Sequence, residues 1–93
     1  MPIYIFSSLS IFTLSNMKSV DLIFLKKFGD NLRKIRKIKG MTQEQLANVL
    51  DIEISQISRI ERGILNTSIS NVFNISKVLD VSICDLFSFS EEM

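Results

Sequence analysis

The chain has 93 residues, enough for one small hydrophobic core but too few for a two-domain enzyme with a cleft between its domains. Hydrophobic residues make up 46% and charged residues 23% of a chain with three glycines and one proline, which excludes a disordered or low-complexity protein. Histidine is absent and Cys84 is the single cysteine, so imidazole-based catalysis, a His/Cys zinc site and an intrachain disulfide are excluded; no metal or cofactor is expected.

The charges are unevenly distributed, although the formal net charge is only +1. Seven of the eleven basic residues lie between Lys26 and Lys39, where Asp30 is the one acid, and four of the ten acids lie in the last fourteen residues. One end of the folded protein therefore carries a positive field of the kind that attracts phosphate. On charge alone, a solvated helix face is the simpler explanation of the basic cluster.

Residues 1–17 form an apolar N-terminal arm that carries no charged side chain. A signal peptide is not expected because no basic residues precede the apolar stretch, and six Ser, Thr and Asn residues interrupt the run that a membrane span would need. The Ile, Phe, Tyr and Thr content favours a strand. Three readings remain open: an arm or strand that pairs with a partner chain, a disordered tail, or sequence upstream of a start at Met17; a membrane anchor ranks below them.

A helical domain is predicted over residues 18–89, beginning with an amphipathic helix over about 20–39 that Gly40 ends. The next helix, over 43–50, has a capping box formed by Thr42 and Gln45 and a hydrophobic staple of Met41 and Leu46. After a tight turn in which Asp51 takes left-handed geometry, a second short helix is expected over 54–62, capped by Glu53 and ended by Gly63.

Two further helices complete the predicted domain. The first, over 69–79, is capped by Thr67 or Ser68 and is expected to bury five residues: Ile69, Val72, Phe73, Ser76 and Leu79. The second, over 83–87, packs Leu86 and Phe87, and Cys84 beside them is expected to be a small buried core residue. Residues 90–93 are expected to form a frayed tail. The fold class is therefore all-α, with five helices and a possible strand in the arm.

The segment TQEQLANVLDIEISQISRIERG, from Thr42 to Gly63, resembles the helix-turn-helix of the Xre-type family, the DNA-binding domains of lambda and 434 repressor and Cro-like proteins. The resemblance covers about residues 26–87, and its spacings are mutually consistent over the whole segment. It implies a five-helix lambda-repressor-like domain in which the second short helix, over 54–62, enters the major groove of double-stranded DNA and the first crosses the phosphate backbone.

The resemblance also implies roles for individual residues. Base readout falls to the outward side of the second short helix, at Ile54, Ser55, Gln56 and Arg59, with Arg59 suited to both O6 and N7 of guanine. Phosphate contacts are expected at Thr42, Gln43, Arg62, Asn66 and Ser68. Ser55 and Gln56 are candidates for either role, and Gln43 has no structural duty that the sequence reveals.

Arg36 and Glu61 resemble a structural ion pair of the family, between its first helix and the end of its recognition helix. One departure from the family pattern is Glu53, which would repel phosphate at the start of the recognition helix and so weaken DNA binding.

The predicted function is a sequence-specific, cytoplasmic transcriptional regulator that reads a pseudo-palindromic operator as a homodimer. The homodimer is inferred from the family and from the small size of the domain. The alternative is a protein-binding module such as an antitoxin, with a toxin or other protein as its partner and the arm as the partner-binding segment. An enzyme is not expected, because the chain lacks a catalytic nucleophile with a general base to activate it.

Overall fold

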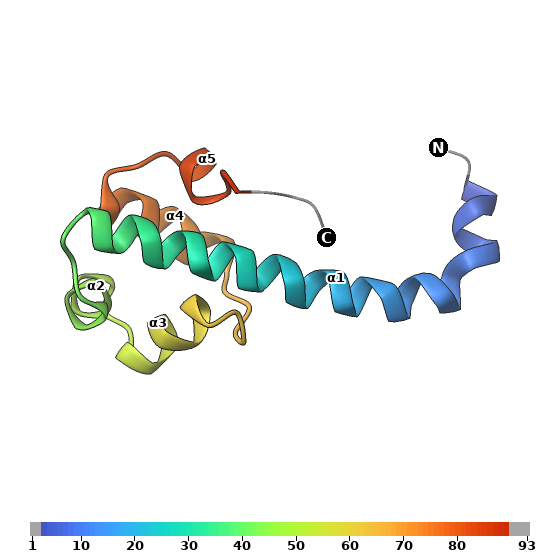
Figure 1. Cartoon of the computed structure of the whole chain (residues 1–93), viewed down its shortest axis with the longest axis horizontal. Coiled ribbons are helices and arrows are strands. Elements are labelled where there is room, and N and C mark those ends of the chain that lie inside the picture. Colours follow the sequence, from blue (N-terminus) through green and yellow to red (C-terminus); the bar gives the residue numbers. More distant parts are fainter. Residues whose placement is uncertain (1–2, 90–93) are drawn as a thin grey trace.

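The computed structural model describes the backbone of residues 3–89 and the side chains of residues 21–89. This part of the chain contains five helices and no strands: α1 (Ile3–Ile38), α2 (Gln43–Leu50), α3 (Ile54–Glu61), α4 (Ile69–Leu79) and α5 (Ile83–Leu86). In Figure 1, α1 runs along the molecule with α2 and α3 below it, while α4 and α5 lie behind and above its C-terminal half. The all-α, five-helix prediction is confirmed.

The first helix is longer than predicted, because it begins at Ile3 rather than near residue 20. The strand favoured for the arm is therefore wrong. No glycine or proline lies between Ile3 and Phe28, so nothing interrupts the helix, and the strand preference of Ile, Phe and Thr is too weak to end it. The pairing role proposed for the arm stays a prediction because the side chains of 3–20 lie outside the described part. The predicted frayed tail at 90–93 also lies outside it.

The core lies where all five helices meet. Its buried apolar side chains come from every helix: Phe28 and Leu32 of α1, Leu46 and Ala47 of α2, Ile57 and Ile60 of α3, Ile75 and Leu79 of α4, and Leu86 of α5. The buried residues of α1, α3 and α4 are three or four positions apart, as the inward side of an amphipathic helix requires, whereas α2 buries two adjacent residues and α5 buries one.

The expected core was wrong at four positions. Ile69 is 87% exposed and Phe73 is 46% exposed, whereas Ile75, which the sequence analysis passed over, is fully buried. The stripe that α4 turns inward contains Ile75, Ser76 and Leu79, and Ile69 lies at the first residue of the helix, beyond the edge of this core. Cys84 is exposed because α5 is a single turn whose buried residue is Leu86.

The predicted helix ends are present. Gly40 has φ +74°, and Gly40 N–H and Met41 N–H donate to the carbonyls of Lys37 and Arg36, which closes α1 in a Schellman motif. Thr42 and Gln45 form the reciprocal capping box of α2, and Asp51 takes left-handed geometry with φ 57° after α2. Ser68, rather than Thr67, caps α4 by accepting from the backbone N–H of Asn71.

Two glycines bring α1 and the end of α3 into backbone contact, which the sequence analysis did not foresee. A Cβ on Gly29 would touch the carbonyl oxygen of Ile60 and lie 2.5 Å from that of Glu61. A Cβ on Gly63 would lie 2.5 Å from Cα of Lys26. Both distances are shorter than carbon contacts allow, so these glycines set how closely α1 packs on α3.

Candidate nucleic-acid interface

The candidate interface is built on the turn between α2 and α3. Asp51, Ile52 and Glu53 connect the two helices, and the N–H of Ile52 donates to the carbonyl of Ala47 at 3.0 Å. Leu46 and Ala47 on α2 and Ile57 and Ile60 on α3 are buried together, which fixes the position of α3. The opposite side of α3 is left facing solvent.

Three of the four predicted base-reading residues are exposed on that outward side. Ile54 is 46% exposed, Ser55 and Arg59 are exposed, and Gln56 is half-buried. Among the side chains of residues 21–89, the two ion pairs are Lys26 with Asp30 and Arg36 with Glu61, so the guanidinium of Arg59 is available to an external acceptor. An exposed arginine with an unengaged guanidinium is suited to guanine or to phosphate.

The predicted phosphate-binding residues are found mostly at helix ends. Thr42 and Ser68 are exposed caps of α2 and α4; each hydroxyl oxygen accepts from a backbone N–H, at 3.0 and 3.1 Å, and keeps its own proton to donate. Asn66 is exposed in the loop before α4. Arg62, the exposed C-cap of α3, makes one long contact of 3.4 Å from Nε to the carbonyl of Ser58. Their contacts with phosphate remain predictions.

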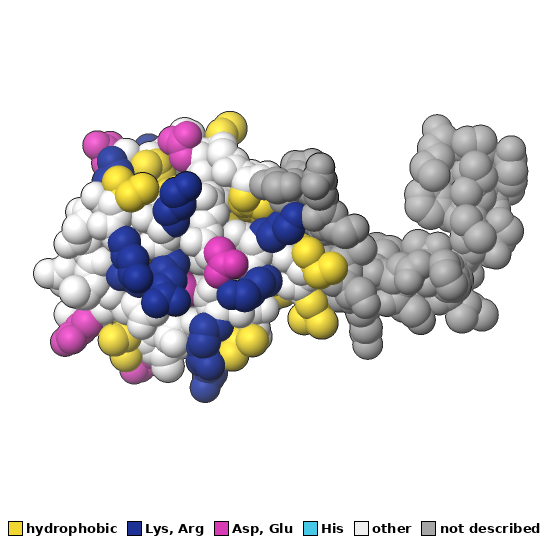
Figure 2. Space-filling view, in the orientation of Figure 1, with side chains coloured by type: hydrophobic (Ala, Val, Ile, Leu, Met, Phe, Trp, Pro, Cys, Tyr) yellow, Lys and Arg dark blue, Asp and Glu magenta, His cyan; other side chains and the backbone are white. Residues whose placement is uncertain are grey.

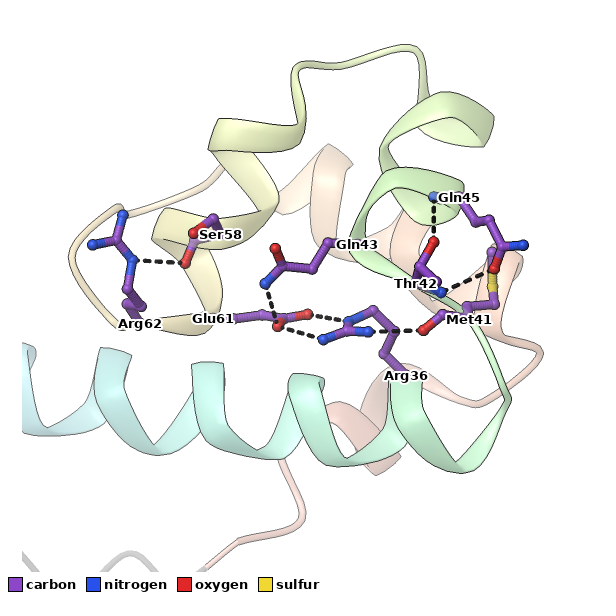
Figure 3. Close-up of polar contacts among 8 residues, drawn as sticks. All are labelled: Arg36, Met41, Thr42, Gln43, Gln45, Ser58, Glu61 and Arg62. Atoms are coloured by element: carbon purple, nitrogen blue, oxygen red, sulfur yellow. Dashed lines mark hydrogen bonds and ion pairs between the residues drawn. The ribbon is translucent and has the colours of Figure 1, made fainter.

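Arg36 and Glu61 are brought together in a buried two-point ion pair (Figure 3). Arg36 Nε donates to Glu61 Oε2 at 2.6 Å and Nη2 donates to Oε1 at 2.9 Å, while Nη1 donates to the carbonyl of Met41 at 2.7 Å. The two side chains are 7% and 2% exposed. The pair therefore joins α1 to the last residue of α3 and to the loop that precedes α2.

Gln43 has a structural contact that the sequence analysis did not identify. Its side-chain Nε2 donates to Oε1 of Glu61 at 3.0 Å, so the first residue of α2 is tied to the last residue of α3 (Figure 3). This contact depends on tertiary structure, since the two residues are 18 positions apart in sequence. The polar network of Arg36, Glu61 and Gln43 thus holds the two short helices at a fixed angle behind the outward side of α3.

Glu53 does not cap α3 with its side chain, contrary to expectation. Its backbone occupies the N-cap position, with φ −70° and ψ 141°, but its carboxylate makes no capping hydrogen bond and the residue is exposed. A glutamate side chain is one methylene longer than the aspartate that favours this position, so reaching back to the helix N–H groups gains little.

Several cations of α1 lie on the exposed side of that helix, unlike the buried Arg36. Figure 2 shows Lys and Arg side chains gathered over the face of the domain turned to the viewer. Arg33, Lys34 and Lys37 are exposed, and Lys26 pairs with Asp30 at 2.8 Å. Arg33 lies three positions before Arg36 and four after Gly29, both of which face α3, so it borders the α3 side of α1. The positive field expected from the sequence therefore adjoins the helix-turn-helix.

Within the described residues, none of the helices is both long enough and apolar enough to cross a bilayer.

Comparison with known proteins identifies the family. The helix-turn-helix family model matches residues 32–86. Control protein C.BamHI of Bacillus amyloliquefaciens is 45% identical over 64 residues, which are 68% of this chain and 79% of that protein. Control protein C.MunI of Mycoplasma sp is 37% identical over 67 residues, which are 71% of this chain and 90% of that protein.

Solved structures agree. The restriction-modification controller protein C.AhdI from Aeromonas hydrophila matches with a TM-score of 0.66 and 38% identity, over 68% of this chain and 96% of that one. A transcriptional regulator from Vibrio cholerae matches with a TM-score of 0.69 over 76% of this chain and 40% of its own, and at 22% identity it shows the fold alone. These relatives favour a regulator over the antitoxin alternative. The chain belongs to the Xre-type helix-turn-helix family and is a DNA-binding transcriptional regulator.

Proposed function

We propose that this regulator controls the expression of a restriction–modification system by binding, as a homodimer in the cytoplasm, to an operator upstream of the genes it regulates. The names of its relatives support the assignment: two are control proteins, and a third, of solved structure, is a restriction-modification controller protein. The observation that carries the proposal is the outward side of α3, where Ile54, Ser55 and Arg59 are exposed on a helix fixed from behind by a buried network.

Sequence recognition follows from that side of α3. A helix of this size enters the major groove, where the edges of the four base pairs differ in their donors and acceptors. Arg59 supplies the donors for guanine, Ile54 an apolar contact for a thymine methyl, and Ser55 and Gln56 hydrogen bonds to bases or phosphates. Five residues bind the phosphate backbone of the DNA on either side of the groove and set the register of the protein on the duplex: Thr42, Gln43, Arg62, Asn66 and Ser68.

Replacing Arg59 with alanine is expected to weaken binding to the operator by about 5- to 150-fold, because one bidentate contact to a base contributes about 1–3 kcal/mol. The measurement is a fluorescence titration on DNA from upstream of the protein's own gene and on a scrambled duplex, at two salt concentrations. Lys77→Ala is the matched control, since Lys77 is an exposed cation near the far end of α4 from Ser68.

The two variants separate base reading from general charge. Both lose one positive charge, so a shared small loss on scrambled DNA measures the electrostatic part alone. Arg59→Ala should lose most of the ratio between operator and scrambled DNA, and Lys77→Ala should keep it. If wild type and Arg59→Ala have the same ratio of operator affinity to scrambled-DNA affinity, the role given to Arg59 is contradicted. If the wild type binds both duplexes equally well, the proposed function itself is contradicted.

The homodimer is supported by apolar side chains exposed beside one another. A cavity of about 140 Å³ opens between α1, α4 and α5 and is lined by Phe24, Leu25, Phe28, Val72 and Phe87. Ile69, which also lines it, and Phe73 on the next turn of α4 are exposed. Covering this surface in a dimer would add buried apolar area to a small domain of marginal stability.

Ile69→Asp is expected to shift the protein from dimer to monomer in light scattering at about 50 µM, because a carboxylate in this surface would lose its hydration on pairing. Folding should be retained, since an acidic residue in the first turn of a helix is favourable. Ile38→Asp is the control, because Ile38 is 71% exposed at the C-terminal end of α1, away from the residues of that helix that line the cavity. A monomeric wild type, or a dimeric Ile69→Asp, would count against this interface.

A further inference from the structure

The carboxylate of Glu53 has no task in the fold that the structure shows. Its backbone carbonyl accepts the N–H of Gln56 at 3.0 Å as α3 begins, but its side chain makes no capping bond and is exposed. Neither of the ion pairs among residues 21–89 includes it. An acidic side chain left free on a DNA-binding helix needs another explanation, because it reduces affinity for phosphate.

The position of Glu53 at the N-cap of α3 supplies an explanation for its free carboxylate. It directly precedes Ile54 and Ser55, which are exposed at the start of α3. The N-terminal residues of a recognition helix are the ones that reach the edges of bases. A carboxylate there is surrounded by the negative field of two phosphate backbones, so it is tolerated only where it meets a hydrogen-bond donor.

The major groove offers two kinds of donor, the N4 amino group of cytosine and the N6 amino group of adenine. The adenine amino group lies beside N7, an acceptor that would repel a carboxylate, and this pair of groups suits the amide of glutamine or asparagine instead. Cytosine presents its amino group without that adjacent acceptor on the same base, and a glutamate can accept from it.

We propose that Glu53 is a specificity-determining residue, which accepts a hydrogen bond from N4 of a cytosine in each half of the operator and excludes other bases at that position by charge. The inference rests on the proposed function, because it requires α3 to lie in the major groove. Glu53 then lowers affinity for DNA in general and restores it at sites with cytosine in register, which widens the difference between operator and other DNA.

The test is selection of binding sites from a randomised double-stranded DNA library by the wild type and by Glu53→Gln. Glutamine keeps the shape of glutamate and removes the charge. Glu44→Gln is the matched control, because Glu44 is an exposed glutamate in the first turn of α2 and its loss changes the net charge equally. Circular dichroism verifies that the three proteins are folded alike.

The wild type should enrich cytosine at one position of each half-site, and replacing that cytosine should weaken binding at least about fivefold. Glu53→Gln should lose this preference, with adenine gaining at the same position, and should bind scrambled DNA more tightly; Glu44→Gln should keep the wild-type motif. If Glu53→Gln enriches the wild-type motif unchanged, the inference is overturned while the proposed function stands. If the wild type enriches no motif, the proposed function has failed and the inference with it.

Discussion

Glu61→Ala is expected to lower the free energy of unfolding by about 3–5 kcal/mol, the largest single effect we foresee in this domain. The change leaves the guanidinium of Arg36 buried, 7% exposed, without the two carboxylate contacts at 2.6 and 2.9 Å that offset its desolvation. The amide of Gln43 also loses its acceptor. A domain of this size has about 5–15 kcal/mol of stability in total, so the change removes a large share of it and should lower the unfolding temperature strongly.

A double-mutant cycle of Arg36→Met and Glu61→Leu distinguishes a structural pair from a pair that acts on DNA. Each single change leaves one buried group unpaired, whereas the double change leaves two apolar side chains of similar volume. Urea unfolding should therefore show a double variant more stable than the sum of the single losses predicts, and DNA affinity should recover with stability. Additive losses, or a stable double variant that no longer binds DNA, would show that the structural assignment is wrong.

Much of the fold was predictable because local chemistry determines it. The capping box at Thr42, the left-handed Asp51 and the terminating Gly40 each depend on a few adjacent residues, and the structure contains all three. The bounds of α2 and α4 accordingly match the predicted ranges. The start of α1 was not predicted, because no cap or breaker divides residues 3–28 and the strand preference of the arm was given more weight than helix continuity.

The site was less predictable because its contacts join distant residues. The exposed side of α3 follows from helical spacing, and the pairing of Arg36 with Glu61 came from family resemblance. The bond from Gln43 to Glu61 crosses 18 residues and the contact of Gly63 with Lys26 crosses 37, and nothing in the local sequence signals either. Phe73 and Ile69 were misplaced because two apolar stripes on α4 are compatible with its sequence, and only packing selects one.

Gly63→Ala is expected to destabilise the domain by about 2–5 kcal/mol, and Gly40→Ala by only about 1–2 kcal/mol. The two glycines have almost the same positive φ, +76° and +74°, so an alanine meets the same backbone penalty at both. They differ in their surroundings. No atom lies within 4 Å of a Cβ on Gly40, whereas a Cβ on Gly63 would lie 2.5 Å from Cα and 2.8 Å from N of Lys26.

The difference between the two variants therefore measures the close approach of α1 to the end of α3. A helix backbone cannot yield locally as a flexible side chain can, so α1 would have to move away from Gly63 and loosen the packing of Phe28 and Ile60. Midpoints of urea unfolding for the two alanine variants give the comparison directly. Equal losses would mean that this approach contributes nothing beyond backbone geometry; a larger loss for Gly63→Ala would mean that one glycine, invisible to helical periodicity, sets the spacing on which the position of the recognition helix depends.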